Sequence, residues 1–202
     1  MIRRIRNGLL MGVALFLLSA CSKTRSWEEE VLLNTGETIW VKRTAEYSYQ
    51  GGAGNPFDMA YRPEGTPILQ FTYKKKKYQF HERIGVLVLA ISPEGVPVLV
   101  GPASSGRWDA VNKYKCTYPF YVQFVPDSSG KRWTWPPAIE SWLYDLPTNL
   151  FRDYGNYQKV QSRYTMQEKS LQPFFRDPQL KHSQKIDQNF TGDICKRKEE
   201  SK

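Results

Sequence analysis

The cysteines are the residues of this 202-residue chain whose positions suggest covalent chemistry. Cys21 ends the run Leu18-Ser19-Ala20-Cys21, directly after the uncharged residues Gly8 to Leu18, and three arginines precede that apolar run. A basic start, a short apolar run and small residues before a cut site are typical of a secretory signal peptide. Cleavage after Ala20 would leave the Cys21 thiol at the new N-terminus, where it is available for acylation.

Leu18-Ser19-Ala20-Cys21 resembles the lipobox that bacterial lipoprotein signal peptidases cleave. The resemblance implies that Cys21 carries a diacylglycerol thioether and an amide-linked acyl chain such as palmitate. One acyl chain holds a protein marginally, at about 0.8 kcal/mol per buried methylene, whereas two or more anchor it stably. Ser22, in place of an aspartate, resembles the sorting signal of enterobacterial outer-membrane lipoproteins. The alternative is an ordinary signal peptide that leaves Cys21 as a free thiol.

The apolar run is too short to span a bilayer, which takes about 20 apolar residues. We therefore expect a lipoprotein of the cell envelope, held by its lipid on the outer membrane and facing the periplasm. Residues 1–20 are the predicted signal peptide and residues 21–26 a polar tether. The predicted β domain covers residues 27–178, followed by a polar segment, 179–202, with a disordered tail.

The chain carries 29 Lys and Arg against 20 Asp and Glu, a net charge of +9. Residues 1–20 hold three of the arginines and no acid, so the remainder carries +6. Because a periplasmic protein meets almost no nucleic acid, this excess favours anionic lipid head groups or acidic envelope polymers as partners. The alternative is a surface charge that only keeps the protein soluble.

Cys116 and Cys195 remain after lipidation, and an oxidising compartment favours a disulfide between them. The bond would close a loop of about 79 residues, which the chain-entropy model values at roughly 4 kcal/mol. Two cysteines so far apart, without clustered histidines, do not predict a metal site. No cofactor is expected either.

Catalysis is limited by the supply of histidines, which are His81 and His182. His81 and Glu82 are neighbours on a predicted strand, so their side chains point to opposite faces. The chain has no Gly-x-Ser-x-Gly elbow, and the acidic run Glu28-Glu29-Glu30 is interpreted as a solvated strand entry. A glycosidase would need two carboxylates across a cleft. We therefore expect no enzyme, with a periplasmic hydrolase as an alternative.

Aromatic residues make up 14% of the chain, and 13 prolines and 14 glycines are scattered along it. Both features favour a mostly-β body with many turns. Strand-like runs flank four turn segments, which are residues 34–36, 74–77, 92–95 and 126–130. The expected fold is an antiparallel meander of about eight strands that forms a single sandwich or small open barrel.

Two strands carry further information. Ile39, Val41 and Arg43 share one face of their strand, whereas Thr38, Trp40 and Lys42 share the other. Residues 86–91 are apolar throughout, which predicts a strand buried on both faces. Residues 49–67 are predicted as a long loop because they are rich in glycine and proline.

The C-terminal third is less regular. Thr165 and Glu168 fit the capping box of a short C-terminal helix, which Pro173 limits to about two turns. Residues 138–146 fit either a short helix or an edge strand.

The candidate binding residues are cations and tryptophans. Lys74, Lys75, Lys76 and Lys77 form the predicted hairpin tip, which is either solvated or in contact with an anionic surface. Trp133 and Trp135 share a strand face and serve either the core or a sugar. The leading hypothesis is a non-catalytic module that binds another envelope protein or polymer.

The alternative is a peptidoglycan- or glycan-binding lipoprotein that uses Trp108, Trp133 or Trp135. The sequence leaves open the ligand, the oligomeric state and the leaflet.

The segment from Trp27 to Arg43 has the pattern Trp-Glu-Glu-Glu-Val-x-Leu-x-x-Gly-x-x-Ile-x-Val-x-Arg. With the preceding lipobox and the following glycines, it resembles the start of a family of uncharacterised proteobacterial lipoproteins over residues 18–55. The resemblance implies an envelope location and a β-hairpin opening. The family has no assigned activity, so the resemblance transfers no catalytic residue.

Overall fold

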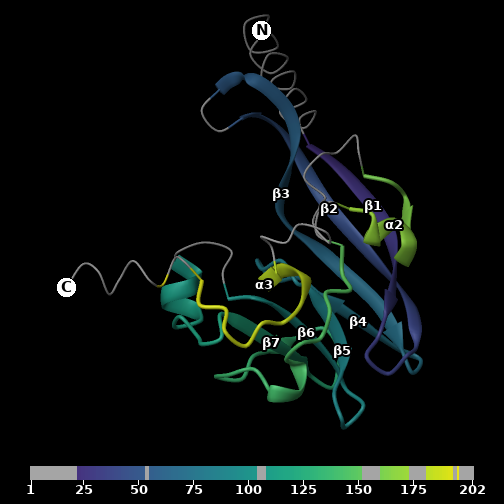
Figure 1. The fold of residues 1–202 in the computed structure, drawn as a ribbon. Coiled ribbons are helices and arrows are strands. Elements are labelled where there is room, and N and C mark those ends of the chain that lie inside the picture. Colours follow the sequence, from purple (N-terminus) through teal and green to yellow (C-terminus); the bar gives the residue numbers. More distant parts are fainter. Residues whose placement is uncertain are drawn as a thin grey trace, which may run out of the picture.

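The computed structural model describes residues 22–52, 55–103, 108–151, 160–172, 181–192 and 195 (Figure 1). Strands dominate, and the helices are short. The elements are β1 (Ser22–Leu32), β2 (Thr38–Gly52), β3 (Asn55–Tyr73), β4 (Lys76–Phe80), β5 (Val88–Ile91), β6 (Pro97–Pro102), a π-helical turn (Asp109–Lys113), β7 (Tyr121–Pro126), β8 (Trp133–Thr134), a 3₁₀ turn (Ser141–Leu143), β9 (Arg163–Tyr164), α2 (Met166–Ser170) and α3 (Lys181–Gln184).

The described strands form two sheets. Sheet A has the order β4-β3-β2-β1-β9, and sheet B has the order β5-β6-β7-β8. Neighbouring strands are antiparallel except for β9, which pairs in parallel with β1. The predicted mostly-β fold is confirmed: the described part of the chain is sandwich-like and does not close into a barrel. The four predicted hairpin turns are also confirmed.

The predicted long loop at residues 49–67 is wrong. β2 continues to Gly52 and β3 begins at Asn55, with Tyr49 opposite Tyr61. The prolines and glycines that suggested a loop lie near the hairpin end or beside an irregular register between Thr44 and Glu46. A bulge accommodates such residues within a strand.

The first described residue, Ser22, already lies in a strand. Residues 22–26, expected as a tether, lie in β1 and pair with β2 from Ser22 opposite Ser48. Cys21 itself and the expected tail at residues 196–202 lie outside the described residues.

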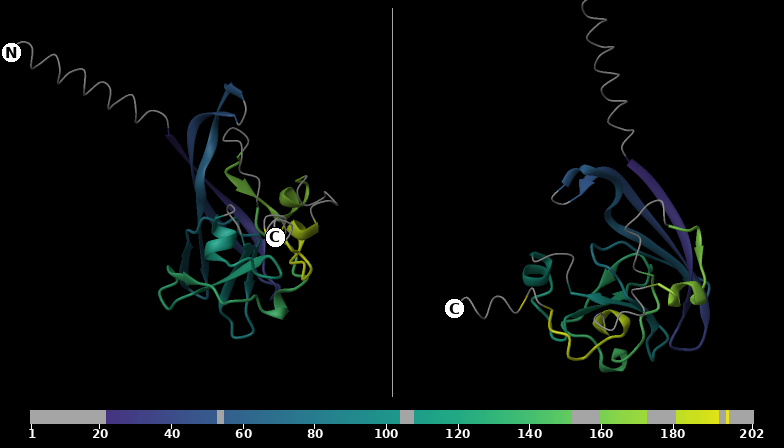
Figure 2. Two further views of the ribbon diagram at one scale, coloured as in Figure 1. Left: turned by 90° about the vertical axis from the view of Figure 1, so that its left-hand side faces the viewer. Right: turned by 45° about the horizontal axis from the view of Figure 1, so that its top comes forward.

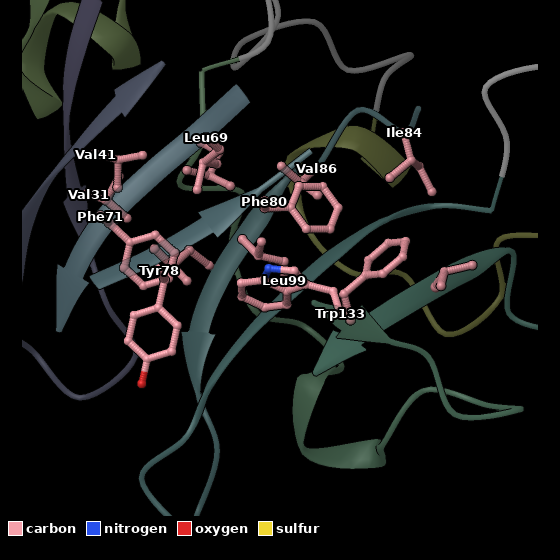
Figure 3. Close-up of a cluster of buried hydrophobic side chains, with 14 of the residues drawn as sticks. Val31, Val41, Leu69, Phe71, Tyr78, Phe80, Ile84, Val86, Leu99 and Trp133 are labelled. Atoms are coloured by element: carbon pink, nitrogen blue, oxygen red, sulfur yellow. The ribbon is translucent and has the colours of Figure 1, made fainter. Parts of the chain in front are cut away.

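The core lies between the inner faces of the two sheets (Figure 3). Full burial of a large apolar side chain contributes about 1.5–3 kcal/mol relative to exposure. The main contributors are Val31, Val41, Leu69, Phe71 and Phe80 from sheet A, and Leu89, Leu99, Val122 and Phe124 from sheet B or its flanks.

The strand predicted to be buried on both faces is confirmed. Residues 86–91 are all buried, and within β5 (Val88–Ile91) alternate side chains enter two different clusters. Leu89 and Ile91 face sheet A, whereas Val88 and Ala90 pack on the side that Leu143 and Ile186 cover.

Two asparagines pair with backbone groups of β5, which is the first strand of sheet B. Asn149 accepts from the Leu89 amide at 2.9 Å and donates to the Leu89 carbonyl at 2.8 Å. Asn34 makes the same two bonds with Ile91, at 2.7 and 2.9 Å. Asn149 also donates to the carbonyl of Leu32 in sheet A. These amides replace a neighbouring strand and protect the edge from pairing with another chain.

A buried ion cluster lies between β1, β2 and α2. Glu29 is fully buried, and its carboxylate accepts from Arg43 Nε at 2.7 Å and Lys169 Nζ at 3.2 Å. The amide of Phe151 also donates to this carboxylate, and Lys169 donates to the carbonyl of Asn149. Burial lowers the pKa of Lys169, while the facing carboxylate of Glu29 opposes that change.

The C-terminal third contains short elements and a disulfide rather than long strands. The capping box at Thr165 and Glu168 is confirmed and opens α2. Residues 138–146 form neither of the expected elements, because they contain only the 3₁₀ turn. A disulfide joins Cys116 to Cys195, with the Cα atoms 5.9 Å apart, as predicted.

Tyr121 couples β7 to the C-terminal segment. Its buried hydroxyl donates to the carbonyl of His182 at 2.6 Å and accepts from the Asp187 amide at 3.2 Å. Burial raises the pKa of Tyr121 to about 12. The phenol therefore contributes its full stabilisation below pH 10, and this is lost as the pH rises from about 10 to 12.

Between about pH 10 and 12 the free energy of unfolding of the unmodified protein should fall by up to about 2–3 kcal/mol, which is what a shift of two pKa units is worth. We expect Tyr121→Phe to lack this fall. At neutral pH the same variant should lose about 1 kcal/mol, because the bond to His182 is gone. Denaturant unfolding from about pH 8 to 12 measures both effects. Tyr118→Phe, at a tyrosine that is 64% exposed, is the control. If the stability of Tyr121→Phe falls between pH 10 and 12 as much as that of the unmodified protein, Tyr121 is not the cause of the alkaline loss.

Candidate binding groove

The outer face of sheet A is hollowed into a groove of about 720 Å³, called groove A. Strand alternation places the side chains of Trp40, Lys42, Gln70 and Gln79 on this face, opposite the core. The full lining is Glu28, Thr38, Ile39, Trp40, Lys42, Gln70, Phe71, Thr72, Lys77, Tyr78, Gln79 and Lys131.

The β7–β8 turn brings Lys131 to the groove by docking on β4. The carbonyl of Gly130 accepts from the backbone N–H of Gln79 at 2.9 Å, and the Trp133 indole donates to the backbone carbonyl of Gln79 at 2.7 Å. Gly130 has φ +73°, and a Cβ there would lie 2.7 Å from the Lys77 carbonyl oxygen. Only glycine allows this approach, which also joins the two sheets at this edge.

Asp127 holds the conformation of the same turn. Its carboxylate accepts from the Ser129 hydroxyl at 2.6 Å and from Arg132 Nε at 3.0 Å. These bonds, that to Ser129 foremost, hold the pKa of Asp127 well below its ordinary value. The turn therefore stays fixed, and Lys131 with it, while the carboxylate is ionised.

A second depression of about 370 Å³, called groove B, adjoins groove A. It shares Gln79 and Lys131 with groove A and adds further polar residues. The two depressions are therefore neighbours. The residues of groove B are Gln79, His81, Glu82, Lys131, Arg132, Trp133 and Thr134.

The charge of groove A is basic. Among the described residues that line groove A, three are cations, Lys42, Lys77 and Lys131, and one, Glu28, is a carboxylate. The guanidinium carbon of Arg163 lies 3.8 Å from the centre of the Trp40 ring, a cation–π contact beside the groove. Groove A therefore combines cations with a 37% exposed indole, which suits an extended anionic ligand.

Groove A also contains Tyr78, which is largely buried. A tyrosine with an ordinary pKa of about 10 is already neutral at physiological pH, and burial raises the pKa of Tyr78 further, so it adds no negative charge to the lining.

The four lysines predicted as one hairpin tip lie in two environments. Lys74 and Lys75 form the turn, with φ of 45° and 66°. Lys76 and Lys77 are already in β4, and only Lys77 lines groove A. Lys76 instead donates to the carbonyl of Asp127.

The predicted tryptophan pair does not form an exposed stacking surface. Trp133 is buried in the core, and its indole bonds to β4. Trp135 is 39% exposed, but its ring packs against Tyr114 and Lys113. Trp108 is 70% exposed and lies away from both grooves' linings.

Sequence reasoning missed Trp40 as a site residue, although a signal was present. Trp40 and Lys42 were expected on the face opposite Val41, which is where they lie. Lys131 offered no comparable signal, because its position depends on a turn that docks across the sheets.

The histidines have different surroundings. His81 is exposed in groove B, and its neighbour Glu82 binds Lys113 at 2.9 Å. The His182 ring stacks on Phe190, with the centroids 4.3 Å apart. Within the described ranges, no three His, Cys, Asp or Glu side chains come together to hold a metal ion. No helix among the described residues is long and apolar enough to cross a membrane.

No protein-family model matches the chain, and searches of curated proteins and of solved structures returned no similar protein. The resemblance to proteobacterial lipoproteins therefore stays a prediction.

Proposed function

We propose that this protein is a lipid-anchored, non-catalytic module of the cell envelope that binds an anionic glycan polymer along grooves A and B. The observation that carries the proposal is that one groove is lined by three cations, Lys42, Lys77 and Lys131, together with the 37% exposed Trp40. A sheet face is rigid and extended, so it fits a polymer better than a small molecule, which needs an enclosed pocket.

The proposed anchor is Cys21. Its support is the lipobox and the position of the first strand, which begins at the next residue. With so little chain between lipid and fold, the body would stay close to the membrane surface, most simply the periplasmic side of the outer membrane.

The absence of catalysis is part of the proposal. Glu28 has no second carboxylate and no histidine beside it among the described residues that line groove A. In groove B the carboxylate of Glu82 is engaged by Lys113. A hydrolase acting on glycans would need two carboxyl groups held across the substrate. These sites bind a polymer without providing that pair.

Glycan binding is tested with variants that carry the same net charge. We expect Lys42→Glu/Lys131→Glu to weaken binding to purified peptidoglycan about tenfold or more, because each reversal replaces an attraction by a repulsion. The matched control is Lys74→Glu/Lys75→Glu, at the turn outside the groove linings. Pelleting with peptidoglycan, and in parallel with lipopolysaccharide, at increasing salt separates the two anionic sources.

The control is expected to bind within about twofold of the unmodified protein, because Lys74 and Lys75 line neither groove. Trp40→Ala should weaken binding without changing its salt dependence. Equal losses in the groove pair and in the turn pair would mean that only net charge matters. That result, or the failure of the unmodified protein to bind either polymer, would refute the proposed function.

A further inference from the structure

We propose that the end of the β2–β3 hairpin is a second membrane contact, which binds anionic phospholipid head groups. The proposed anchor at Cys21 supports its location, but its chemistry is independent of acylation. The surface, called the end patch, consists of Lys23, Tyr49, Met59 and Tyr61.

The hairpin projects past the start of β1. Ser22 pairs with Ser48, whereas β2 and β3 continue from Tyr49 opposite Tyr61 to Gly52 opposite Asn55. Four further residues of strand extend the sheet by about 13 Å. Figure 2 shows this hairpin end projecting from the body beside the start of β1. A lipid on the residue before Ser22 would therefore place this end at the head groups.

The four side chains of the end patch lie on one face. Residues directly opposite on antiparallel strands point to the same side of a sheet. Lys23 lies opposite Tyr47, Tyr49 opposite Tyr61, and Gly51 opposite Met59.

Their contacts confirm the grouping. The rings of Tyr49 and Tyr61 are 5.3 Å apart, and Lys23 Nζ lies 4.2 Å from the centre of the Tyr61 ring. Lys23 and the two tyrosines thus form one contiguous surface, with Met59 beside it.

The end patch continues a core face beyond the segment that covers it. Closer to the body, the same face is buried in a cluster with Phe151, Val160 and Tyr164, which Tyr61 touches. Past that cluster, Tyr49 is 47% exposed and Met59 is 44% exposed. Apolar side chains that are about half exposed next to the proposed anchor are suited to contact with another surface.

The chemistry of the end patch matches a lipid interface. Tyrosine places its ring among the acyl chains and its hydroxyl at the head groups. Lys23 and Arg25 are on this face, and none of its described side chains in residues 22–25, 45–51 and 59–63 is a carboxylate. Anionic lipids attract such cations. A second copy is a poorer partner, because the lysines of the two patches would repel.

Vesicle sedimentation tests the inference with the unacylated chain that begins at Ser22, which contains the whole described fold. The vesicles are phosphatidylcholine, with or without phosphatidylglycerol. We expect binding only with phosphatidylglycerol, and Lys23→Glu should weaken it about tenfold or more. Lys75→Glu makes the same change of net charge at the far end of sheet A and should weaken binding less than about threefold. Tyr49→Ser should weaken binding at constant net charge.

Three results would overturn the inference. Equal losses in Lys23→Glu and Lys75→Glu would mean that net charge alone drives binding. A loss with Lys131→Glu and none with Lys23→Glu would place the phospholipid in groove A. A change of self-association in Tyr49→Ser, with unchanged vesicle binding, would make the patch an interface between copies.

The anchor is examined separately, by incorporation of labelled palmitate into the full chain and into its Cys21→Ser variant. A full chain without label would refute the anchor and leave the vesicle result standing. Conversely, a labelled protein whose unacylated form ignores the vesicles would keep the anchor and refute the end patch.

Discussion

Replacing Glu29 by glutamine is expected to lower the free energy of unfolding by about 3–5 kcal/mol, the usual cost of removing one partner from a buried ion pair. The carboxylate of Glu29 is the acceptor shared by Arg43, Lys169 and the Phe151 amide. The side chains of Glu29, Arg43 and Lys169 are each at least 96% buried. Glutamine keeps the shape but leaves two buried cations without the carboxylate that they contact.

Few other groups in the cluster can compensate for the lost carboxylate. It already holds two cations against one carboxylate, and Arg43 Nη2 is buried with no hydrogen-bond partner among the described residues. Lys169 can lose its proton, since burial lowers its pKa, whereas the Arg43 guanidinium stays charged. We therefore expect α2, which carries Lys169, to detach first.

Denaturant unfolding of Glu29→Gln and of Glu28→Gln gives the comparison, because Glu28 is the exposed neighbour on the same strand. The Glu28 variant should change stability by less than about 0.5 kcal/mol. Hydrogen exchange of the α2 amides should rise in the Glu29 variant alone. A loss of under about 1 kcal/mol would mean that water already solvates the cluster.

The environment of Glu29 was not predicted from the sequence. Glu28-Glu29-Glu30 was interpreted as a solvated run, yet alternation turns Glu29 inward, to the face of Val31. Arg43 was expected to share a face with Ile39 and Val41, and a cation on that apolar face was a sign that an acid belonged beside it. The third partner, Lys169, lies 140 residues away in sequence. Neither periodicity nor spacing can place such a contact.

Hairpins were predictable because their turns depend on local conformation. Gly36, Gly95 and Gly130 have positive φ at the expected turns, where glycine avoids strain. Lys74 and Lys75 also adopt positive φ without being glycine, so that turn was found from the flanking strands alone. A sandwich implies two sheets, but the point where the chain passes from one to the other was not predictable, because nothing local marks the passage from β4 to β5 as a change of sheet.

The candidate grooves were predictable in part. One strand's alternation was enough to expect Trp40 and Lys42 together on an outer face. Assembling groove A also required β4 and the turn at Gly130, whose approach to Lys77 depends on tertiary packing. The edge protection by Asn34 and Asn149 is of the same kind, since each side chain pairs with a strand about 60 residues away.

Loss of the Cys116–Cys195 disulfide is expected to lower the free energy of unfolding by about 4 kcal/mol, from the chain entropy of its 79-residue loop. Between these cysteines the chain forms β7, β8, β9, α2 and α3. Without the bond, the unfolded chain gains freedom across a long stretch of the protein.

Native contacts should keep the C-terminal segment in place when the disulfide is removed. The amide of Phe120 donates to the Phe190 carbonyl at 2.7 Å, and a Cβ on Gly192 would lie within 2.4 Å of the Phe120 ring. These contacts, with the Tyr121 bond to His182, hold residues 181–192 on β7 after the bond is removed. We therefore expect Cys116→Ser/Cys195→Ser to fold, and to unfold at lower denaturant.

Two measurements separate the global effect from a local one. Denaturant unfolding of oxidised, reduced and double-serine protein should give equal losses for the last two forms. Hydrogen exchange should then show residues 181–192 opening more easily than β2 and β3, whose pairing lies outside the closed loop. If global stability changes by under about 1 kcal/mol while exchange rises only in residues 181–192, the disulfide secures the C-terminal segment rather than the whole fold. That outcome would contradict the entropic estimate, because freeing the unfolded chain should lower global stability whatever contacts hold residues 181–192 in the native state.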